Sequence, residues 1–330
     1  MNVALFGATG FVGGRLLDAL LQRGDSVTAL VRTPDAAGAL RARGVDALVG
    51  ELLDPETVAR TCRGAELVVN TAGALGRWNT PVGEMEAVNS RAPGLVVASA
   101  FGRVVHVGTV GVTGPLPDGV DAAEEYPLQP ATDYQLTKLK GEASAREAHY
   151  RTGVPLTIVR PSFVYGPRDM HKLPLFRAVA KRRIALVNGG RSRLHPVYVD
   201  DLVSGILLAA ELSPGDGRAY NICGPRPVTV RELIGAISTA LGLPTTRLSV
   251  PETLLLPLAC AVETACSLAG KEPPITRSKV RLLSENYAYS TERARRELGY
   301  LPAVDLEEGI ARTVDYYRRH QLLGGMPDAG

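Results

Sequence analysis

The sequence predicts an α/β protein with a doubly wound parallel sheet, followed by a smaller C-terminal α/β domain. In the first half of the chain, short and almost entirely apolar runs alternate with helix-like stretches, which is typical of parallel strands covered by helices on both faces. A glycine-rich turn directly follows the first of these runs. After about residue 161, prolines become dense and the segments less regular, so we place the domain boundary at residues 160/161.

Each expected element rests on a local pattern. Buried-type apolar runs predict six strands, at residues 3–6, 27–31, 47–49, 67–70, 104–107 and 157–159. Helix-like stretches lie between them, at 11–23, 55–62, 83–100 and 132–151. In the second half, "TVRE" at 229–232 is a capping box that opens a helix through about 241, and "DLEE" at 305–308 opens the last helix. Crossovers between parallel strands should be right-handed.

Composition excludes several classes of function. The 330 residues carry 37 basic and 34 acidic side chains, and this balance leaves no electrostatic footprint for nucleic acid. The four cysteines form no C-x-x-C pair and have no histidine cluster near them, so neither a zinc site nor a disulfide framework is expected. A strand-like run starts at residue 2 without a secretory signal before it. We therefore expect reduced thiols and a cytoplasmic protein.

The most apolar stretch is "TLLLPLACAVETACSLAG" at 253–270. Pro257 and Glu263 interrupt it, and it is too short to span a bilayer comfortably. We expect a helix that covers a substrate pocket here. Contact with a membrane interface is the less favoured alternative.

The glycine turn lies in "VALFGATGFVGGRLL", which begins at residue 3. Gly7, Gly10 and Gly13 have the spacing G-x-x-G-x-x-G, directly after a predicted strand and directly before a predicted helix. Glycines at such positions permit a tight turn, close approach of the backbone to a pyrophosphate, and close helix–strand packing. The helix N-terminus then offers free N–H groups to the phosphates. The pattern therefore predicts a dinucleotide site.

The residue after the second strand bears on the type of dinucleotide. An NAD site usually has an acidic residue at the end of this strand, but Val31 occupies that position and Arg32 follows it. A guanidinium without a neighbouring acid suits the 2′-phosphate of NADP(H), which we favour over NAD(H). The alternative is that Arg32 merely covers the adenine of bound NAD.

A tyrosine and a lysine stand four positions apart in "TDYQLTKLKGE" at 132–142. On a helix, Tyr134 and Lys138 share one face, although spacing alone does not separate a proton-transfer pair from two surface residues. "RVVHVGTVGVTG" at 103–114 supplies the context: this strand ends at the sheet edge where ligands bind, and Thr109 follows it. Thr109, Tyr134 and Lys138 can therefore converge beside a nicotinamide.

At this point the sequence resembles the extended short-chain dehydrogenase/reductase superfamily, that is, the NAD-dependent epimerase/dehydratase family. The resemblance covers essentially the whole chain and implies a Rossmann NAD(P)-binding domain at 1–160 and a mainly substrate-binding domain at 161–330, with some segments returning to the sheet. It rests on "GATGFVG" at 7, "NTAGA" at 70, Asn89, "TVGVTG" at 109, "YQLTK" at 134, "RPSFVYGP" at 160, "HPVYVDDLV" at 195 and "ARRELGYLP" at 294.

The resemblance implies a role for each catalytic residue. Tyr134 would exchange a proton with the substrate oxygen, and the Lys138 cation would lower the tyrosine pKa and bond the nicotinamide ribose. Thr109 replaces the commoner serine and would hold the substrate oxygen. Asn89 is the helix-bending and water-holding position. Gly108, often serine in relatives, removes one polar contact.

The resemblance also implies binding residues. In addition to Tyr134 and Lys138, the cofactor would contact Gly7, Thr9, Gly10, Phe11, Val12, Gly13, Arg32, Glu51, Leu52, Thr71, Ala72, Gly73, Pro161, Phe163 and Val164. The substrate would lie between the domains, against Leu75, Trp78, Thr109, Val110, Ser162, His171 and Phe176. His195 precedes a strand, and we interpret it as structural. Relatives dimerise through the helices that carry Asn89 and Tyr134, so we expect a homodimer.

The reaction stays open between classes at this stage. We favour interconversion of a hydroxyl and a carbonyl on a mainly apolar or natural-product-like molecule, because "AGALGRW" at 72–78 resembles the sterol dehydrogenase, dihydroflavonol reductase and hopanoid-associated branch. Sugar-nucleotide enzymes commonly carry a phosphate-binding arginine where this chain has Leu194, although Arg193 is adjacent. A nucleotide-sugar epimerase or dehydratase with recycled NAD is the alternative. The third class, a non-catalytic NADP sensor, conflicts with the intact Thr109, Tyr134 and Lys138.

Overall fold

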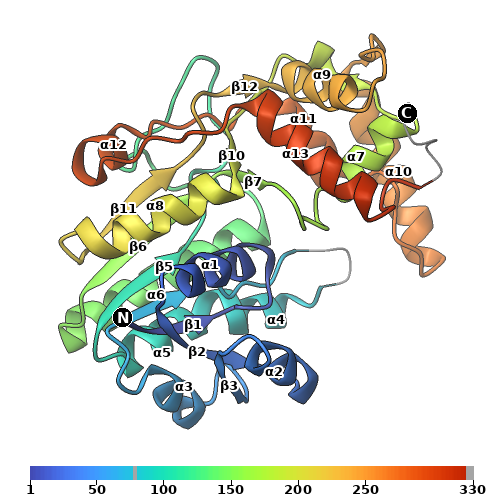
Figure 1. Cartoon of the computed structure of the whole chain (residues 1–330). Coiled ribbons are helices and arrows are strands. Elements are labelled where there is room, and N and C mark those ends of the chain that lie inside the picture. The colour runs from blue at the N-terminus through green and yellow to red at the C-terminus, as the bar shows by residue number, and fades with distance from the viewer. Residues whose placement is uncertain (77–79, 325–330) are drawn as a thin grey trace.

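The computed structural model describes residues 1–76 and 80–324. Its centre is a seven-stranded sheet of order β11-β6-β5-β4-β1-β2-β3, in which every neighbouring pair is parallel (Figure 1). The strands are β1 (Asn2–Phe6), β2 (Ser26–Val31), β3 (Asp46–Val49), β4 (Leu67–Asn70), β5 (Arg103–Val107), β6 (Leu156–Pro161) and β11 (Asp216–Ile222). The predicted doubly wound sheet and all six predicted strands are confirmed.

Strand order reverses between β1 and β4, so the sheet has a topological switch point there. In open parallel sheets, ligands bind in the crevice at the carboxyl ends of the strands that flank this point. The glycine turn after β1 and the loop after β4 therefore lie side by side, as their hydrogen bonds show: Thr71 N donates to the carbonyl of Phe6 at 3.0 Å.

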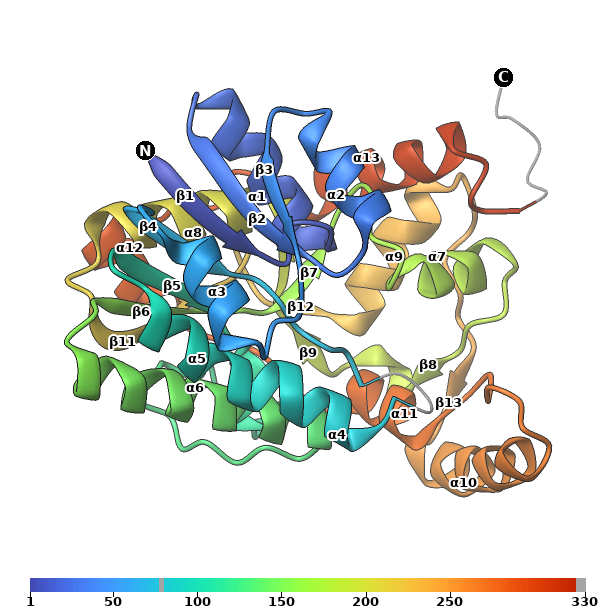
Figure 2. The ribbon, with the colours of Figure 1, turned by 90° about the horizontal axis from the view of Figure 1, so that it is seen from below.

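Helices cover both faces of the sheet (Figure 2). One face packs on α1 (Phe11–Gln22), α2 (Pro34–Arg41), α8 (Val199–Leu212) and α12 (Glu292–Leu298). The other packs on α3 (Pro55–Cys62), α5 (Ala92–Ser99) and α6 (Asp133–Thr152). Sequence patterning missed α2, α8, α12 and the edge strand β11. β11 was hidden because Arg218 and Asn221 interrupt its apolar run, and both find polar partners across the chain.

The helix predicted at 83–100 is divided into three parts. A short α4 (Val82–Met85) leads into a π-helical segment η1 (Glu86–Arg91), and α5 follows. Asn89 lies inside η1 and is fully buried. Such π-turns are rare and often occur at functional sites.

The rest of the second half folds around two further hydrophobic clusters, the smaller of which holds α10 (Glu252–Leu268). The helices of this part are α7 (Leu173–Ala180), α9 (Val230–Ala240), α10, α11 (Arg277–Ser284) and α13 (Leu306–Arg319). Its short strands are β7 (Phe163–Tyr165), β8 (Leu186–Val187), β9 (Arg193–Leu194), β10 (Pro196–Tyr198), β12 (Val228–Thr229) and β13 (Ser249–Val250). The described residues also include the 3-10 segments η2 (Val110–Thr113), which follows β5 in the first half, and η3 (Asn188–Gly190) in the second half.

The capping box that was read from the sequence is confirmed: the Thr229 side chain accepts from the backbone N–H of Glu232, whose carboxylate accepts from the N–H of Thr229. Among the described residues, no helix combines the length and apolar character needed to cross a bilayer.

Candidate active site

The glycine turn has no room for side chains at two of its glycines. Gly7 has a φ of +88°, and a Cβ there would lie 2.7 Å from the backbone nitrogen of Ala72. A Cβ on Gly13 would lie 2.1 Å from the carbonyl oxygen of Gly7. The Gly10 N–H closes the turn by donating to the same carbonyl at 2.9 Å. Glycine is therefore required at positions 7 and 13, because the turn after β1, the start of α1 and the backbone at Ala72 approach one another closely.

The start of α1 suits a phosphate group. The helix begins at Phe11 after Gly10, which provides no side-chain cap. The first N–H groups of a helix lack intrahelical partners and attract anions. Thr9 and Gly10 are exposed, while Phe11 and Val12 are partly exposed. These residues fit the pyrophosphate of a dinucleotide.

Asn89 ties the loop after β4 to the helix that carries Tyr134. Its side-chain oxygen accepts from the N–H of Ala74 at 2.8 Å, and its amide donates to the carbonyl of Ala74 at 2.9 Å. The amide also donates to the Thr137 hydroxyl at 3.1 Å. The Asn89 amide group is thus committed to protein contacts, and it positions the loop that contains Thr71, Ala72 and Gly73.

Tyr134 lies in the first turn of α6 and Lys138 lies one turn later. Thr132 caps the helix by accepting from the N–H of Gln135 at 3.2 Å. The Lys138 ammonium is buried and donates to the carbonyl of Val107, at the end of β5, at 2.7 Å. This bond anchors α6 to the carboxyl end of the sheet and leaves two further ammonium protons for other partners.

Thr109 approaches the same helix from β5. It is the N-cap of η2, where its hydroxyl accepts from the N–H of Gly111 at 3.1 Å. Gly111, in η2, lies close to both Thr109 and α6: a Cβ on Gly111 would be 3.4 Å from the Thr109 hydroxyl and 3.4 Å from the side chain of Gln135, the residue after Tyr134. Gly76, in the loop after β4, also lies close to α6, because a Cβ on Gly76 would be 3.4 Å from the Cβ of Tyr134. The structure therefore brings the β4 loop, the β5 end and the start of α6 together.

Burial shifts the pKa values of both members of the Tyr-x-x-x-Lys pair. Loss of solvent raises the pKa of Tyr134 to about 12, and the lowering expected from the Lys138 cation does not offset it. It lowers the pKa of Lys138 to about 8, against the opposing charge of Glu142. At neutral pH, Tyr134 is therefore a protonated donor, and Lys138 is close to the range in which it loses its charge.

A buried ion pair that sequence patterning missed lies one turn beyond Lys138. The Arg160 guanidinium, 2% exposed as a residue, donates to both oxygens of the fully buried Glu142, at 3.0 and 2.7 Å. Arg146 adds a contact at 3.3 Å. A Cβ on Gly108 would lie only 2.6 Å from the Glu142 carboxylate. Gly108 therefore makes room for this carboxylate. The absence of a serine at this position thus does more than remove one polar contact.

Replacing Glu142 with glutamine should lower the free energy of unfolding by about 3 kcal/mol, because Arg160 would keep a buried charge without a counter-ion. The matched control is Glu297→Gln, which removes an acid from the more exposed Arg218 and should cost less than about 1 kcal/mol. Chemical unfolding of both variants measures the difference. Equal losses would contradict the importance assigned to the buried pair.

Three of the predicted cofactor-binding residues, Arg32, Glu51 and Leu52, lie after the ends of β2 and β3. Arg32 is exposed directly after β2, and Thr33 caps α2 by accepting from the N–H of Ala36 at 3.3 Å. Glu51 is exposed and Leu52 partly buried in the turn after β3. An arginine beside a helix N-terminus is an arrangement that suits an anion.

Another segment predicted to contact the cofactor runs from the end of β6 into β7. Pro161 is buried at the end of β6, and Phe163 and Val164 are partly exposed in β7. Between them, the Ser162 hydroxyl donates to the carbonyl of His195. The His195 ring accepts from Tyr289 N–H through Nδ1 and donates to the Gly224 carbonyl through Nε2, and burial lowers its pKa to about 4. These bonds to backbone groups give His195 a structural role.

The predicted substrate residues differ in accessibility. Leu75 is 40% exposed and His171 is exposed. Phe176 is 1% exposed and packs edge-on against the Tyr317 ring, so in this structure it belongs to the core. Val110 is also buried, in a small cluster with Tyr289. Trp78 lies outside the described residues.

The position at which sugar-nucleotide enzymes commonly carry a phosphate-binding arginine is apolar and buried in this chain. Leu194 is 1% exposed within the core of the second half. Its neighbour Arg193 forms an ion pair with Asp121 at 2.8 Å. Neither residue presents an unpaired cation to a substrate diphosphate.

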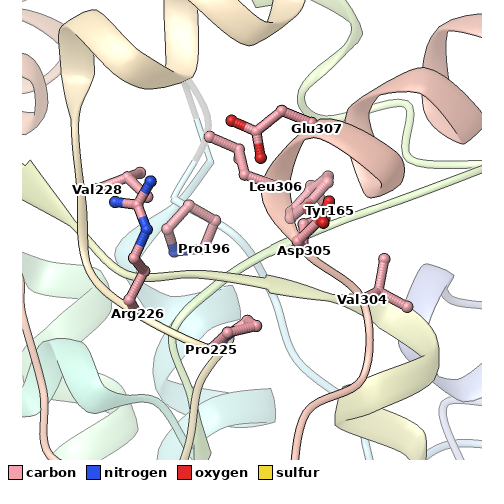
Figure 3. A pocket seen from close by; sticks show the side chains of 9 residues that line it. All are labelled: Tyr165, Pro196, Pro225, Arg226, Val228, Val304, Asp305, Leu306 and Glu307. Carbon is pink, nitrogen blue, oxygen red and sulfur yellow. Dashed lines mark hydrogen bonds between the residues drawn. The ribbon is translucent and has the colours of Figure 1, made fainter.

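A separate cavity lies where β7 and β10 meet the start of α13, and it contains none of the residues predicted to be catalytic (Figure 3). Its volume is about 140 Å³. Arg226, which lines this cavity, forms an ion pair with Glu232. Two acidic residues, Asp305 and Glu307, line the same cavity. The lining residues are Tyr165, Pro196, Pro225, Arg226, Val228, Val304, Asp305, Leu306 and Glu307.

Comparison with known proteins relates the chain to a family of NAD-dependent enzymes. Residues 3–223 match the model of the NAD dependent epimerase/dehydratase family. A 4-hydroxy-2-methyl-3-oxo-4-farnesyl-3,4-dihydroquinoline-1-oxide ketoreductase from Stigmatella aurantiaca is 31% identical over 322 residues, which cover 94% of this chain and 95% of the relative. A 2-alkyl-3-oxoalkanoate reductase from Stenotrophomonas maltophilia is 29% identical over 334 residues, covering 94% and 98%.

A solved structure has the same fold. UDP-glucuronic acid 4-epimerase from Bacillus cereus, in complex with NAD, superimposes with a TM-score of 0.75 and 20% identity, covering 97% of this chain and 99% of that one. At this identity the likeness concerns the fold alone.

Proposed function

This chain belongs to the NAD-dependent epimerase/dehydratase family, and from this premise we propose that it is a net oxidoreductase that interconverts a hydroxyl and a carbonyl on a lipophilic small molecule. The family and the extended short-chain dehydrogenase/reductase type that the motifs predicted are confirmed. Such an enzyme uses a nicotinamide cofactor, and the glycine turn and the uncapped start of α1 fit its pyrophosphate.

The choice of a net oxidoreductase over a nucleotide-sugar enzyme rests on one observation. The position that would bind a nucleotide-sugar diphosphate is occupied by the buried Leu194, and Arg193 is held by Asp121. A substrate diphosphate would need unpaired cations to offset the loss of its hydration. The reductase names of two relatives that span most of the chain support the same choice. The nucleotide-sugar epimerase or dehydratase remains the alternative.

The chain's own residues would supply binding and proton transfer. When bound, the nicotinamide supplies or accepts the hydride. In the reductive direction, Tyr134 donates its proton to the substrate oxygen, and Thr109 holds that oxygen through its hydroxyl. The Lys138 ammonium stabilises the resulting tyrosinate, while Asn89 keeps the β4 loop against α6.

NADP(H) is the proposed cofactor, because Arg32 is exposed beside the start of α2 with no acid at the end of β2. Arg32→Ala should weaken NADP(H) binding by about tenfold or more, with little change for NAD(H), because only the 2′-phosphate loses a charge-assisted contact. Titration calorimetry on the purified variant measures both. Arg43→Ala, which removes a cation paired with Asp18, is the control. An equal loss for both nucleotides would contradict the role of Arg32.

The experiment that tests the reaction class is to denature the purified protein and identify any released nucleotide, then to assay the active protein with NADPH and a panel of lipophilic ketones. We expect exchangeable NADP(H) and net consumption of NADPH. Tightly retained NAD, together with turnover of a UDP-sugar but of no ketone, would overturn the proposal in favour of the epimerase or dehydratase.

A homodimer through α5 and α6 is also proposed. The outward side of α6 exposes Leu136 by 41% and Tyr150 by 75%, with Ala143 exposed between them. Apolar side chains spaced in this way along one helix are typical of a helix-packing surface. Sedimentation equilibrium should give twice the chain mass, and Leu136→Glu/Ala143→Glu should reduce it to one.

A further inference from the structure

Helix α10 presents an apolar stripe to solvent. Leu254, Leu258, Ala261, Ala265 and Leu268 alternate in spacings of four and three residues, so they share one side of the helix, and all five are exposed. The three leucines are 65, 53 and 87% exposed. The opposite side holds α10 on the protein, where Ala259 is fully buried with Val187 and Val280.

The place of α10 in the fold leaves this stripe open. Figures 1 and 2 both show α10 at the periphery, and Figure 2 shows α11 beside it. Glu263 fixes the pair by accepting from the Arg277 guanidinium at 2.6 Å. Two further leucines near α10 are exposed as well, Leu248 by 62% and Leu282 by 40%. Burying this many leucines in an apolar medium is favourable.

The charges around the stripe have one predominant sign. Four exposed cations flank α10 in sequence and form no ion pair within the described part of the chain: Arg247, Lys271, Lys279 and Arg281. The acids near α10 and α11 that form no ion pair within the described part of the chain are Glu252, Glu272 and Glu285. Glu285 accepts a hydrogen bond from the Tyr287 hydroxyl at 3.0 Å. Leucines bordered by cations are the combination with which interfacial helices bind anionic lipid surfaces.

We propose that the α10–α11 face is a docking surface for an anionic membrane, with the leucines of α10 inserted at the headgroup boundary and the flanking cations on the headgroups. The proposal takes up the less favoured of the two expectations for this stretch, contact with a membrane interface, in place of cover for a substrate pocket. This surface would allow a lipophilic substrate to enter from the bilayer, but the docking itself does not depend on the proposed reaction.

A second copy of the chain suits the same surface less well. A stable protein interface needs about 20–30 residues on each side, far more than one stripe offers. In a symmetric pair, Lys279 and Arg281 of one copy would also approach those of the other, and like charges would repel. Anionic lipid turns the same charges into an attraction.

Vesicle flotation of the purified full chain tests the proposal without substrate or cofactor. We expect the protein to float with vesicles of phosphatidylcholine and phosphatidylglycerol, and much less with phosphatidylcholine alone. Leu254→Ser/Leu258→Ser/Leu268→Ser should lower the partition coefficient by about tenfold or more. Lys279→Glu/Arg281→Glu should abolish the preference for the anionic vesicles.

The matched control replaces two equally exposed apolar residues elsewhere, Phe101→Ser and Leu301→Ser, which are 82 and 70% exposed in the native chain. This control should float like the native protein. Circular dichroism and thermal unfolding verify that every variant is folded. Flotation that survives the triple leucine variant, or no flotation of the native chain, would overturn the proposal. Self-association that the leucine variant abolishes, without flotation, would identify a second copy as the occupant.

Discussion

Replacing Tyr134 with phenylalanine is expected to lower kcat/KM by about a hundred- to ten-thousand-fold, while cofactor affinity changes little. In the proposed mechanism the Tyr134 hydroxyl donates the proton, and phenylalanine keeps the Cβ that lies close to Gly76. Initial rates with a ketone substrate and fluorescence titration of the cofactor measure the two quantities separately. Tyr150→Phe, at an exposed position of the same helix, is the control and should retain full activity. A Tyr134→Phe enzyme with native kcat/KM would remove Tyr134 from the mechanism.

The pH dependence of the native enzyme follows from Lys138. Burial lowers its pKa to about 8, so the ammonium is present below this pH and lost above it. Because the Tyr134 pKa is raised to about 12, tyrosine keeps its proton over the same range. The reductive kcat/KM should therefore fall as pH rises through about 8. Removing the negative charge of Glu142 should move this fall to lower pH, because the carboxylate supports the charged form of Lys138.

The second large effect is expected when Gly13 is replaced with alanine, which should weaken cofactor binding. An alanine Cβ there would lie 2.1 Å from the carbonyl oxygen of Gly7, which belongs to backbone and cannot move aside alone. The whole turn must shift, so we expect cofactor affinity to fall by about a hundredfold and stability by about 1–3 kcal/mol. Calorimetric titration and thermal unfolding measure the two effects.

The neighbouring glycine provides the control for this substitution. A Cβ on Gly14 would lie 3.5 Å from the carbonyl oxygen of Ala8, an ordinary contact. Gly14→Ala should therefore leave cofactor binding unchanged and stabilise α1 slightly, because alanine favours the helix. If both alanine variants bind the cofactor equally well, the close packing of Gly13 does not shape the site.

The sequence by itself determined most of the sheet, the glycine turn and the position of Tyr134 and Lys138 one turn apart on a single helix. Strands buried on both faces are apolar at nearly every position, and a turn without space for a Cβ requires glycine. Both constraints limit the type of residue at each position, so they are visible in the local sequence even though some of the contacts are long-range. β11 escaped because Arg218 and Asn221 meet their partners only after the chain has folded.

The tertiary structure alone decided the surroundings of the site and the exposure of α10. The π-turn at Asn89 is recognisable only when its amide meets Ala74 and Thr137, and the partner of Glu142 arrives from β6. An apolar helix has the same composition whether its face is covered by protein or exposed. Hydropathy therefore predicted a helix at 253–270 but could not predict which of its faces would be exposed. Long-range packing settles which atoms become neighbours, and no local pattern encodes it.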